Sequence, residues 1–152
     1  MELATPGAKD GRWVGGGTFS SHPLTMASGL AVLKQLKTKS ENYPQLNRMG
    51  DSFRKRLNDM LGEMGASLIG TGYGSINFIS CLKDQIDGDL VTPGQLGRLF
   101  DHHNQNVFQS LLMQEGIFGY HGLGALSFSH TTRDIEKTLE SISNVVKVLM
   151  DA

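Results

Sequence analysis

The fold is decided by a stretch that predicts a β-hairpin, residues 66–82, with the sequence ASLIGTGYGSINFISCL. Its apolar runs at 66–69 and 75–82 predict two strands, and the glycine-rich loop 70–74 joins them. A connection this short predicts an antiparallel pair. A dinucleotide-binding fingerprint needs a helix after its glycines, and here a second strand follows, so we interpret the loop as a tight hairpin turn.

The segment before the hairpin begins with a predicted helix at residues 23–38. Proline fits the first helical position because its missing N–H is not needed there, so Pro23 marks the start. Ser21 is expected to cap it. The side chains of this helix are apolar nearly all round, which predicts that it is buried on several sides.

A second helix is predicted at residues 41–64, directly before the first strand. Its apolar residues recur at steps of three and four and form one stripe. The opposite face carries charged residues, Arg54 among them, and is interpreted as a solvated surface. Gly65 is expected to end the helix in a left-handed conformation.

After the hairpin, a capping box formed by Thr92 and Gln95 predicts the start of a third helix. The apolar pattern predicts that this helix runs unbroken over residues 93–115 and packs on the sheet. His103 falls on its apolar face, and Gly116 is expected to close its end.

The last part of the chain predicts a strand stub at 117–118, a strand at 125–129 and an amphipathic helix opened by a second capping box, Thr131–Asp134. The predicted order is α–α–β–β–α–β–α. This is an α+β fold with a small, mostly antiparallel sheet of about three strands, covered by helices and preceded by a loop and a helix.

By region, the sequence predicts a glycine-rich loop at 1–21 that serves as an interface and phosphate contact, a linking helix at 22–40, and a small α+β domain at 41–152. A chain of 152 residues fits one domain that can bury a core without disulfides or metals.

Charge and composition exclude several functions. The 14 Lys and Arg residues against 15 Asp and Glu argue against nucleic-acid partners and acidic membranes, because both attract a basic excess. A single cysteine, Cys81, excludes an internal disulfide framework, and its apolar strand predicts burial. The sequence has no apolar run of membrane-spanning length and no signal-peptide pattern at its start, so we expect a cytoplasmic protein.

The strongest local signal of chemistry is the stretch GGGTFSSHP at residues 15–23. Three glycines let backbone N–H groups approach a ligand, Thr18 adds a hydroxyl, and a helix N-terminus follows. This combination predicts a phosphate or anion site, although it is not a Walker A loop. On these residues alone, a flexible loop capped by serine is an equal alternative.

Other histidines and serines are weaker candidates. His102 and His103 point about 100° apart on a helix, which disfavours a shared metal. His121 and His130 lack cysteine partners and a recognisable zinc spacing, so no metal site is predicted. Ser127 near His130 raises the idea of a hydrolase, but the GxSxG elbow is absent and a structural role is favoured.

Residues 16–31, GGTFSSHPLTMASGLA, resemble a motif of class III (fold type I) pyridoxal-phosphate (PLP) aminotransferases, and most closely that of glutamate-1-semialdehyde 2,1-aminomutases. That motif reads GT[FL]S-x-[NH]-P-L-x-M-A-A-G-L-A. The resemblance continues at 68–78, at 112–117 (LMQEGI) and at 127–135 (SFSHTTRDI). The matches follow one another in order over nearly the whole chain, and the first is the most specific.

The resemblance implies that the chain is the C-terminal part of such an enzyme, comprising the linking helix and the small C-terminal domain. The step Gly17–Thr18 is similar to the one at which the family's threonine binds the PLP phosphate of the neighbouring subunit in a homodimer. The substrate would be a small amino acid or amino aldehyde. Trp13 and the apolar helix at 23–38 would pack on a missing N-terminal large domain.

The chain also departs from the family. The Schiff-base lysine lies upstream in the family, and Lys9 has none of the lysine motif around it, so no catalytic residue is assigned in this chain, which should be inactive alone. His22 stands where Asn is commoner, and 119–124 is shorter than the aminomutase pattern, so a related ω- or β-amino-acid transaminase fits nearly as well. The alternative is a standalone, non-catalytic α+β module for binding or oligomerisation.

Overall fold

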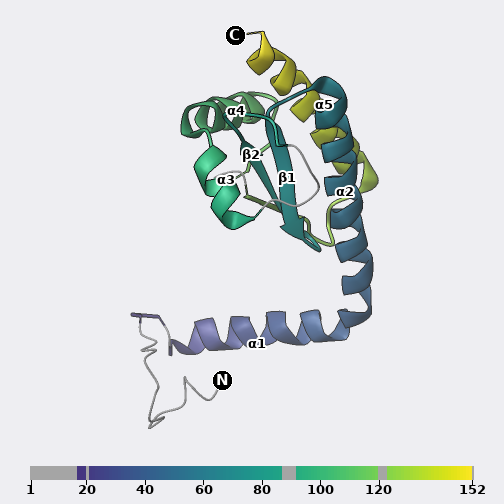
Figure 1. Ribbon diagram of the computed structural model, residues 1–152. Helices are drawn as coiled ribbons and strands as arrows, with labels where there is room; N and C mark the ends of the chain where they lie inside the picture. The colour runs from purple at the N-terminus through teal and green to yellow at the C-terminus, as the bar shows by residue number, and fades with distance from the viewer. Residues whose placement is uncertain (1–16, 20, 87–91, 120–122, 152) are drawn as a thin grey trace. The chain divides into compact units, whose positions relative to one another are not determined.

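The computed structural model describes residues 17–19, 21–86, 92–119 and 123–151. The chain divides into two compact units, Met1–Glu41 and Asn42–Ala152, and each is described by itself. The first unit contains helix α1 (Pro23–Thr38), and a short 3-10 helix η2 (Ser40–Asn42) follows it. The second unit holds the remaining elements (Figure 1): α2 (Tyr43–Met64), β1 (Leu68–Tyr73), β2 (Ile76–Cys81), α3 (Pro93–Leu99), α4 (His102–Gln114), β3 (Leu123–Ala125) and α5 (Thr132–Met150).

The three strands form one antiparallel sheet in the order β1-β2-β3. Along the first pair, Leu68 lies opposite Cys81 and Tyr73 lies opposite Ile76. On the other side of β2, Ile76 pairs with Ala125. The predicted α+β class and three-stranded antiparallel sheet are therefore confirmed.

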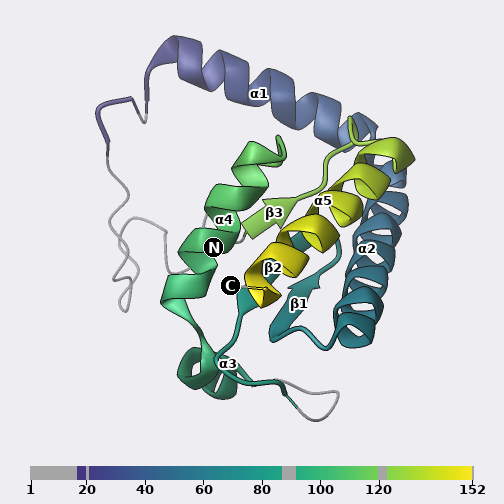
Figure 2. The same ribbon diagram turned by 90° about the horizontal axis from the view of Figure 1, so that it is seen from above.

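The core of the second unit lies between the sheet and helices α2, α4 and α5, and Figure 2 shows α5 lying between α4 and α2. Cys81 of β2 is buried in this core, whereas the alternate residues Ile76 and Phe78 are 49% and 42% exposed. Because side chains alternate along a strand, the helices cover one face of the sheet, and the other face is exposed at Ile76 and Phe78 but buried at Ser80. The largest fully buried side chains are Phe108, Leu57, Leu61, Ile142, Val146 and Cys81.

The predicted helix ends are largely confirmed. Thr92 and Thr131 each cap a helix in a capping box, with Gln95 and Asp134 as their respective partners. These boxes satisfy N–H groups that a helix leaves without internal partners. Gly65 ends α2 in the left-handed region with φ 66°.

The prediction of a strand at 66–69 and a loop at 70–74 is wrong in its boundaries. Strand β1 continues through Tyr73, which pairs with Ile76, so the connection is a two-residue turn. Gly72 belongs to the strand: its φ is 141°, and a Cβ there would lie 2.1 Å from the carbonyl oxygen of Ile76. These glycines therefore serve a tightly packed strand and not a long loop.

The predicted unbroken helix at 93–115 is two helices, α3 and α4. Phe100 between them is extended, with ψ 126°, and pairs with Leu82 in an antiparallel bridge. Asp101 then caps α4, because its side chain accepts the N–H of Asn104 at 3.0 Å. The pairing with the segment after β2 interrupts the helix, and the new start changes its phase, which leaves His103 exposed and away from the core.

Two further strand boundaries also differ from the prediction. Residues 117–118 are not in a strand, and β3 covers 123–125 in place of 125–129. The strand ends early because the N–H of His130 donates to the carbonyl oxygen of Ser127 at 3.1 Å and closes a turn.

The start of the second helix is shifted as well. Residues 40–42 form the 3-10 helix η2, and the α-helix begins at Tyr43 rather than at residue 41. A tighter 3-10 turn commonly leads into an α-helix.

Candidate functional site

The predicted phosphate contact, Gly17 and Thr18, lies directly before α1 in the first unit. Both residues are exposed, so an N–H group and a hydroxyl are accessible at the same point of the chain. The other two glycines of this stretch, Gly15 and Gly16, lie outside the described residues, as does Trp13.

The start of α1 follows this contact immediately. The N–H of His22 donates to the carbonyl oxygen of Phe19 at 3.2 Å, and Pro23 occupies the first helical turn. His22 stands at the N-cap position and makes no side-chain capping hydrogen bond, so the prediction that Ser21 caps the helix is wrong. When no side chain caps the start of a helix, its first backbone N–H groups can donate to another acceptor. An anion is such an acceptor.

Helix α1 itself has no buried residue in the described structure. The sequence predicts that this helix is buried on several sides. In the described structure its apolar side chains are instead more than half exposed at Leu24, Met26, Leu30, Val32 and Leu33. Isolated exposed apolar residues are ordinary, but a helix that exposes them all round is typical of a surface that another chain segment covers.

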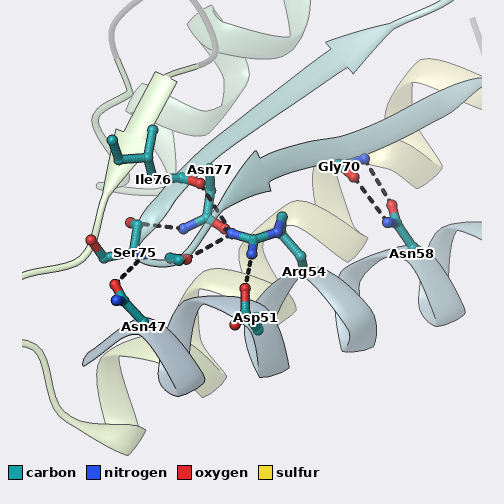
Figure 3. Close-up of polar contacts among 9 residues, drawn as sticks. Asn47, Asp51, Arg54, Asn58, Gly70, Ser75, Ile76 and Asn77 are labelled. Atoms are coloured by element: carbon teal, nitrogen blue, oxygen red, sulfur yellow. Dashed lines mark hydrogen bonds and ion pairs between the residues drawn. The ribbon is translucent and has the colours of Figure 1, made fainter. Parts of the chain in front are cut away.

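In the second unit, α2 holds the hairpin turn through Arg54 (Figure 3). Its guanidinium donates to the carbonyl oxygens of Gly74 at 2.8 Å and Ile76 at 3.0 Å, and to Oδ1 of Asn77 at 2.7 Å. It also forms an ion pair with Asp51. The interpretation of Arg54 as a solvated residue is wrong, since its side chain is 12% exposed. No local pattern distinguishes it from the other charged residues of the helix.

Two more contacts fix the same hairpin to α2 (Figure 3). The side chain of Asn58 pairs with the backbone of Gly70, accepting its N–H at 2.7 Å and donating to its carbonyl oxygen at 2.9 Å. Gly50 allows the close approach of helix and turn, because a Cβ there would lie 2.0 Å from the carbonyl oxygen of Gly74. The hairpin is thus held against α2 by side chains of the helix. The residue pattern of the strands does not indicate these contacts.

The one cysteine is buried, as predicted. Burial raises the pKa of the Cys81 thiol to about 12, and the nearby charge of Asp101 adds to the effect. A thiol that stays protonated is a poor nucleophile and metal ligand. Cys81 is therefore a packing residue of the sheet.

Of the remaining histidine and serine candidates, His121 lies outside the described residues, and Ser127 and His130 lie in one turn. The N–H of Ser127 donates to Nδ1 of His130 at 2.9 Å, and the Ser127 hydroxyl lies 3.1 Å from the same atom. Because that nitrogen is occupied by a backbone N–H of its own turn, it is not poised as a base for the serine. Within the described part of the chain, no three His, Cys, Asp or Glu side chains are placed to hold a metal ion.

The fold matches that of solved transaminases. A β-phenylalanine aminotransferase from Variovorax paradoxus has a TM-score of 0.73 and 27% identity, covering 93% of this chain and 32% of its own. An ω-transaminase from Sphaerobacter thermophilus has a TM-score of 0.68 and 23% identity, covering 91% of this chain and 31% of its own. The fold is that of the small C-terminal domain of fold type I transaminases, as the sequence resemblance implies.

The relatives in sequence define a narrower family than the solved structures do. The glutamate-1-semialdehyde 2,1-aminomutase 2 of Lachnoclostridium phytofermentans is 30% identical over 135 residues, which cover 87% of this chain and 30% of that protein. The aminomutase of Methanosphaera stadtmanae is 30% identical over 145 residues, covering 93% of this chain and 32% of that protein. The resemblance is therefore confirmed: this chain is homologous to the glutamate-1-semialdehyde 2,1-aminomutases and spans 30–32% of the length of these two relatives.

No protein-family model matches the chain. Among the described residues, no helix combines the length and apolar character required to cross a bilayer.

Proposed function

We propose that this chain acts as the C-terminal part of a PLP-dependent aminotransferase or aminomutase that moves an amino group on a small amino acid or amino aldehyde. The observation that supports this most is homology in order along 87% of the chain to an aminomutase, together with a transaminase fold at a TM-score of 0.73. The β- and ω-amino-acid transaminases share the fold, so the aminomutase relatives favour, but do not fix, the glutamate-1-semialdehyde reaction.

In this proposal, Gly17 and Thr18 hold the cofactor phosphate of the neighbouring subunit in a homodimer. Their exposure supports the assignment, as does the helix start without a side-chain cap that follows them. A threonine hydroxyl and backbone N–H groups at a helix N-terminus are donors suited to a phosphate. When bound, PLP supplies an electron sink for the bond changes at the amino carbon.

The remaining two-thirds of an aminomutase-length protein would supply the large domain and the lysine that binds PLP covalently. The exposed apolar surface of α1 supports this partner, because it offers a large area for packing. The chain alone would then be inactive, and its partners would be a second subunit and the small substrate, with no role for nucleic acid or membrane. A cytoplasmic location fits such an enzyme.

A chimeric enzyme tests the proposal. This chain replaces the matched segment of the Lachnoclostridium phytofermentans aminomutase, and PLP binding and amino-group transfer are measured. We expect a dimer that binds PLP, and Thr18→Ala should weaken PLP binding about tenfold through loss of a hydrogen bond to a charged group. The control is Thr132→Ala, which changes an exposed threonine of α5 in the second unit. The phosphate assignment would be contradicted if Thr18→Ala left the PLP affinity of a folded, dimeric chimera unchanged.

The second candidate is a standalone module for binding or oligomerisation, which the self-contained core of the second unit favours. A PLP titration of the purified chain, followed by borohydride reduction, tests whether this chain contains the lysine that binds PLP covalently. The proposal predicts no stable reduced adduct. A stoichiometric adduct on one lysine would show that the chain carries its own covalent cofactor site and would overturn the assignment of that lysine to another domain.

A further inference from the structure

A cavity of about 340 Å³ opens in the second unit between α4, α5 and the end of the sheet at β3. Its floor is formed by the buried side chains Phe108, Leu112 and Ile142. Gly124 borders it, and a Cβ added there would meet no described atom within 4 Å, so there is room for a larger side chain at this position. Sites for small organic molecules start at about 300 Å³ and are mostly apolar with a few polar groups.

Among the described residues that line this cavity, the side chains of His130, Lys137 and Gln109 carry donors that can serve a ligand. Nδ1 of His130 accepts the N–H of Ser127 at 2.9 Å, so the neutral ring carries its proton on Nε2, which is a donor. Nζ of Lys137 lies 3.8 Å from the point that a Cβ would occupy on Gly116, which places the ammonium group beside the cavity wall.

The third donor is Gln109, whose Nε2 is buried and has no hydrogen-bond partner in the part of the chain that the structure describes. A buried donor without a partner is costly, and in a folded protein it calls for an acceptor. Gln109 lines the cavity, and because the terminal amide torsion of glutamine is broad, its amide can reorient when a ligand binds.

Two of the described acceptors that border the cavity, Oδ2 of Asp134 and Oδ1 of Asn77, already accept hydrogen bonds. The carboxylate of Asp134 accepts the N–H and the hydroxyl of Thr131, each at 2.7 Å. Oδ1 of Asn77 accepts from Arg54 at 2.7 Å. The cavity therefore combines apolar walls with the donors of Lys137, His130 and Gln109, and this combination suits a ligand with an anionic head on an apolar body.

We infer that this cavity binds a small carboxylate with a compact apolar body, which rests on Phe108 and Leu112 while its carboxylate accepts from Lys137, His130 and Gln109. A monocarboxylate fits better than a phosphate dianion, because Asp134 offsets the charge of Lys137 and the lining then lacks the excess positive charge that a dianion needs. This inference does not rest on the proposed aminotransferase function, since its residues lie in the second unit and Gly17 and Thr18 lie in the first.

The test is an NMR titration of the full chain with phenylacetate, compared with 2-phenylethanol and acetate. Phenylethanol keeps the ring without the charge, and acetate keeps the charge without the ring. We expect saturable shifts at Leu112, Leu126 and His130 with phenylacetate, about tenfold weaker binding of 2-phenylethanol, and no saturation with acetate. Equal binding of phenylacetate and 2-phenylethanol would overturn the carboxylate assignment. The absence of saturable shifts at these residues would overturn the site.

Two variants locate the binding, each with a matched control. Gly124→Leu fills the cavity and should abolish the shifts, whereas Gly62→Leu places the same side chain in open space on α2 and should not. Lys137→Met should weaken phenylacetate about tenfold and leave 2-phenylethanol unchanged. Lys147→Met, on the exposed last turn of α5, should change neither. Binding that survives Gly124→Leu in a folded protein would overturn the proposed location.

Discussion

The guanidinium of Arg54 in α2 donates to the carbonyl oxygen of Gly74 at 2.8 Å, across 20 residues of chain. This contact joins the middle of the long helix to the hairpin turn. The same group also reaches Ile76 and Asn77, so one side chain fixes both the turn and the first residues of β2. The hairpin geometry therefore depends on a helix residue that the strand sequence does not specify.

Removing this donor should destabilise the protein. We expect Arg54→Met to lower the free energy of unfolding by about 2–3 kcal/mol, because the carbonyl oxygens of Gly74 and Ile76 lose a charged partner. Arg54→Lys should recover only part of this, since one ammonium group cannot bind the acceptors around Nη1 and also pair with Asp51 as Nη2 does. Urea unfolding measures the effect. Lys55→Met, which removes an exposed ion pair with Asp59, should change stability by about 0.5 kcal/mol or less.

A methyl group at Gly50 should be costly, because its Cβ would lie 2.0 Å from the carbonyl oxygen of Gly74 and the backbone would have to move. We expect Gly50→Ala to destabilise by about 1–3 kcal/mol. Gly62→Ala on the same helix meets open space and should stabilise by about 0.5–1 kcal/mol through helix propensity. Thermal unfolding of both variants measures the two changes in stability. Equal changes would contradict the close approach of Gly50 to Gly74.

The Cys81 thiol should be unreactive in the folded protein. With a pKa raised to about 12, mainly by burial, it is protonated at all ordinary pH values. At pH 8 the thiolate would be about one part in ten thousand, and access is also blocked. Labelling with a thiol reagent should follow unfolding by urea. Rapid labelling under native conditions would show that β2 opens far more easily than its burial implies.

Acid should weaken the start of α5. Hydrogen bonds from the N–H and hydroxyl of Thr131 lower the pKa of Asp134 below its ordinary value of 3.8. A carboxyl with a lowered pKa contributes stability above its unfolded pKa and loses it as the pH falls through the folded value. We therefore expect the urea midpoint of the natural chain to fall below pH 3.8 more steeply than that of Asp134→Asn. Glu140→Gln, an exposed change on the same helix, should keep the natural dependence.

Helix α1 should drive self-association of the isolated chain, because Leu30 and Leu33 are 54% and 64% exposed on a helix with no buried residue. Replacing both with glutamate should shift the sedimentation profile toward the monomer, since charge opposes the burial of this surface. Light scattering provides the second measurement. A monodisperse monomer of the unmodified chain would count against this prediction.

The sequence by itself determined the elements whose signals are local. The capping boxes at Thr92 and Thr131 and the left-handed Gly65 depend on neighbouring residues, and all three lie where they were predicted. The ordered motifs at 16–31 and 127–135 identified the family, because several matches in series are specific even where each is short. The assignment of Gly17 and Thr18 to a phosphate stays a prediction that the chimera tests.

Tertiary structure decided what depends on distant partners. The break between α3 and α4 arises because Phe100 pairs with Leu82, and this contact competes with helical hydrogen bonds. The apolar pattern of the sequence does not indicate this pairing. The strand role of Gly72 and the burial of Arg54 likewise follow from atoms on other elements. Hydrophobic period and capping act over a few residues, whereas strand register, buried charge and cavities are set by packing between segments far apart in the chain.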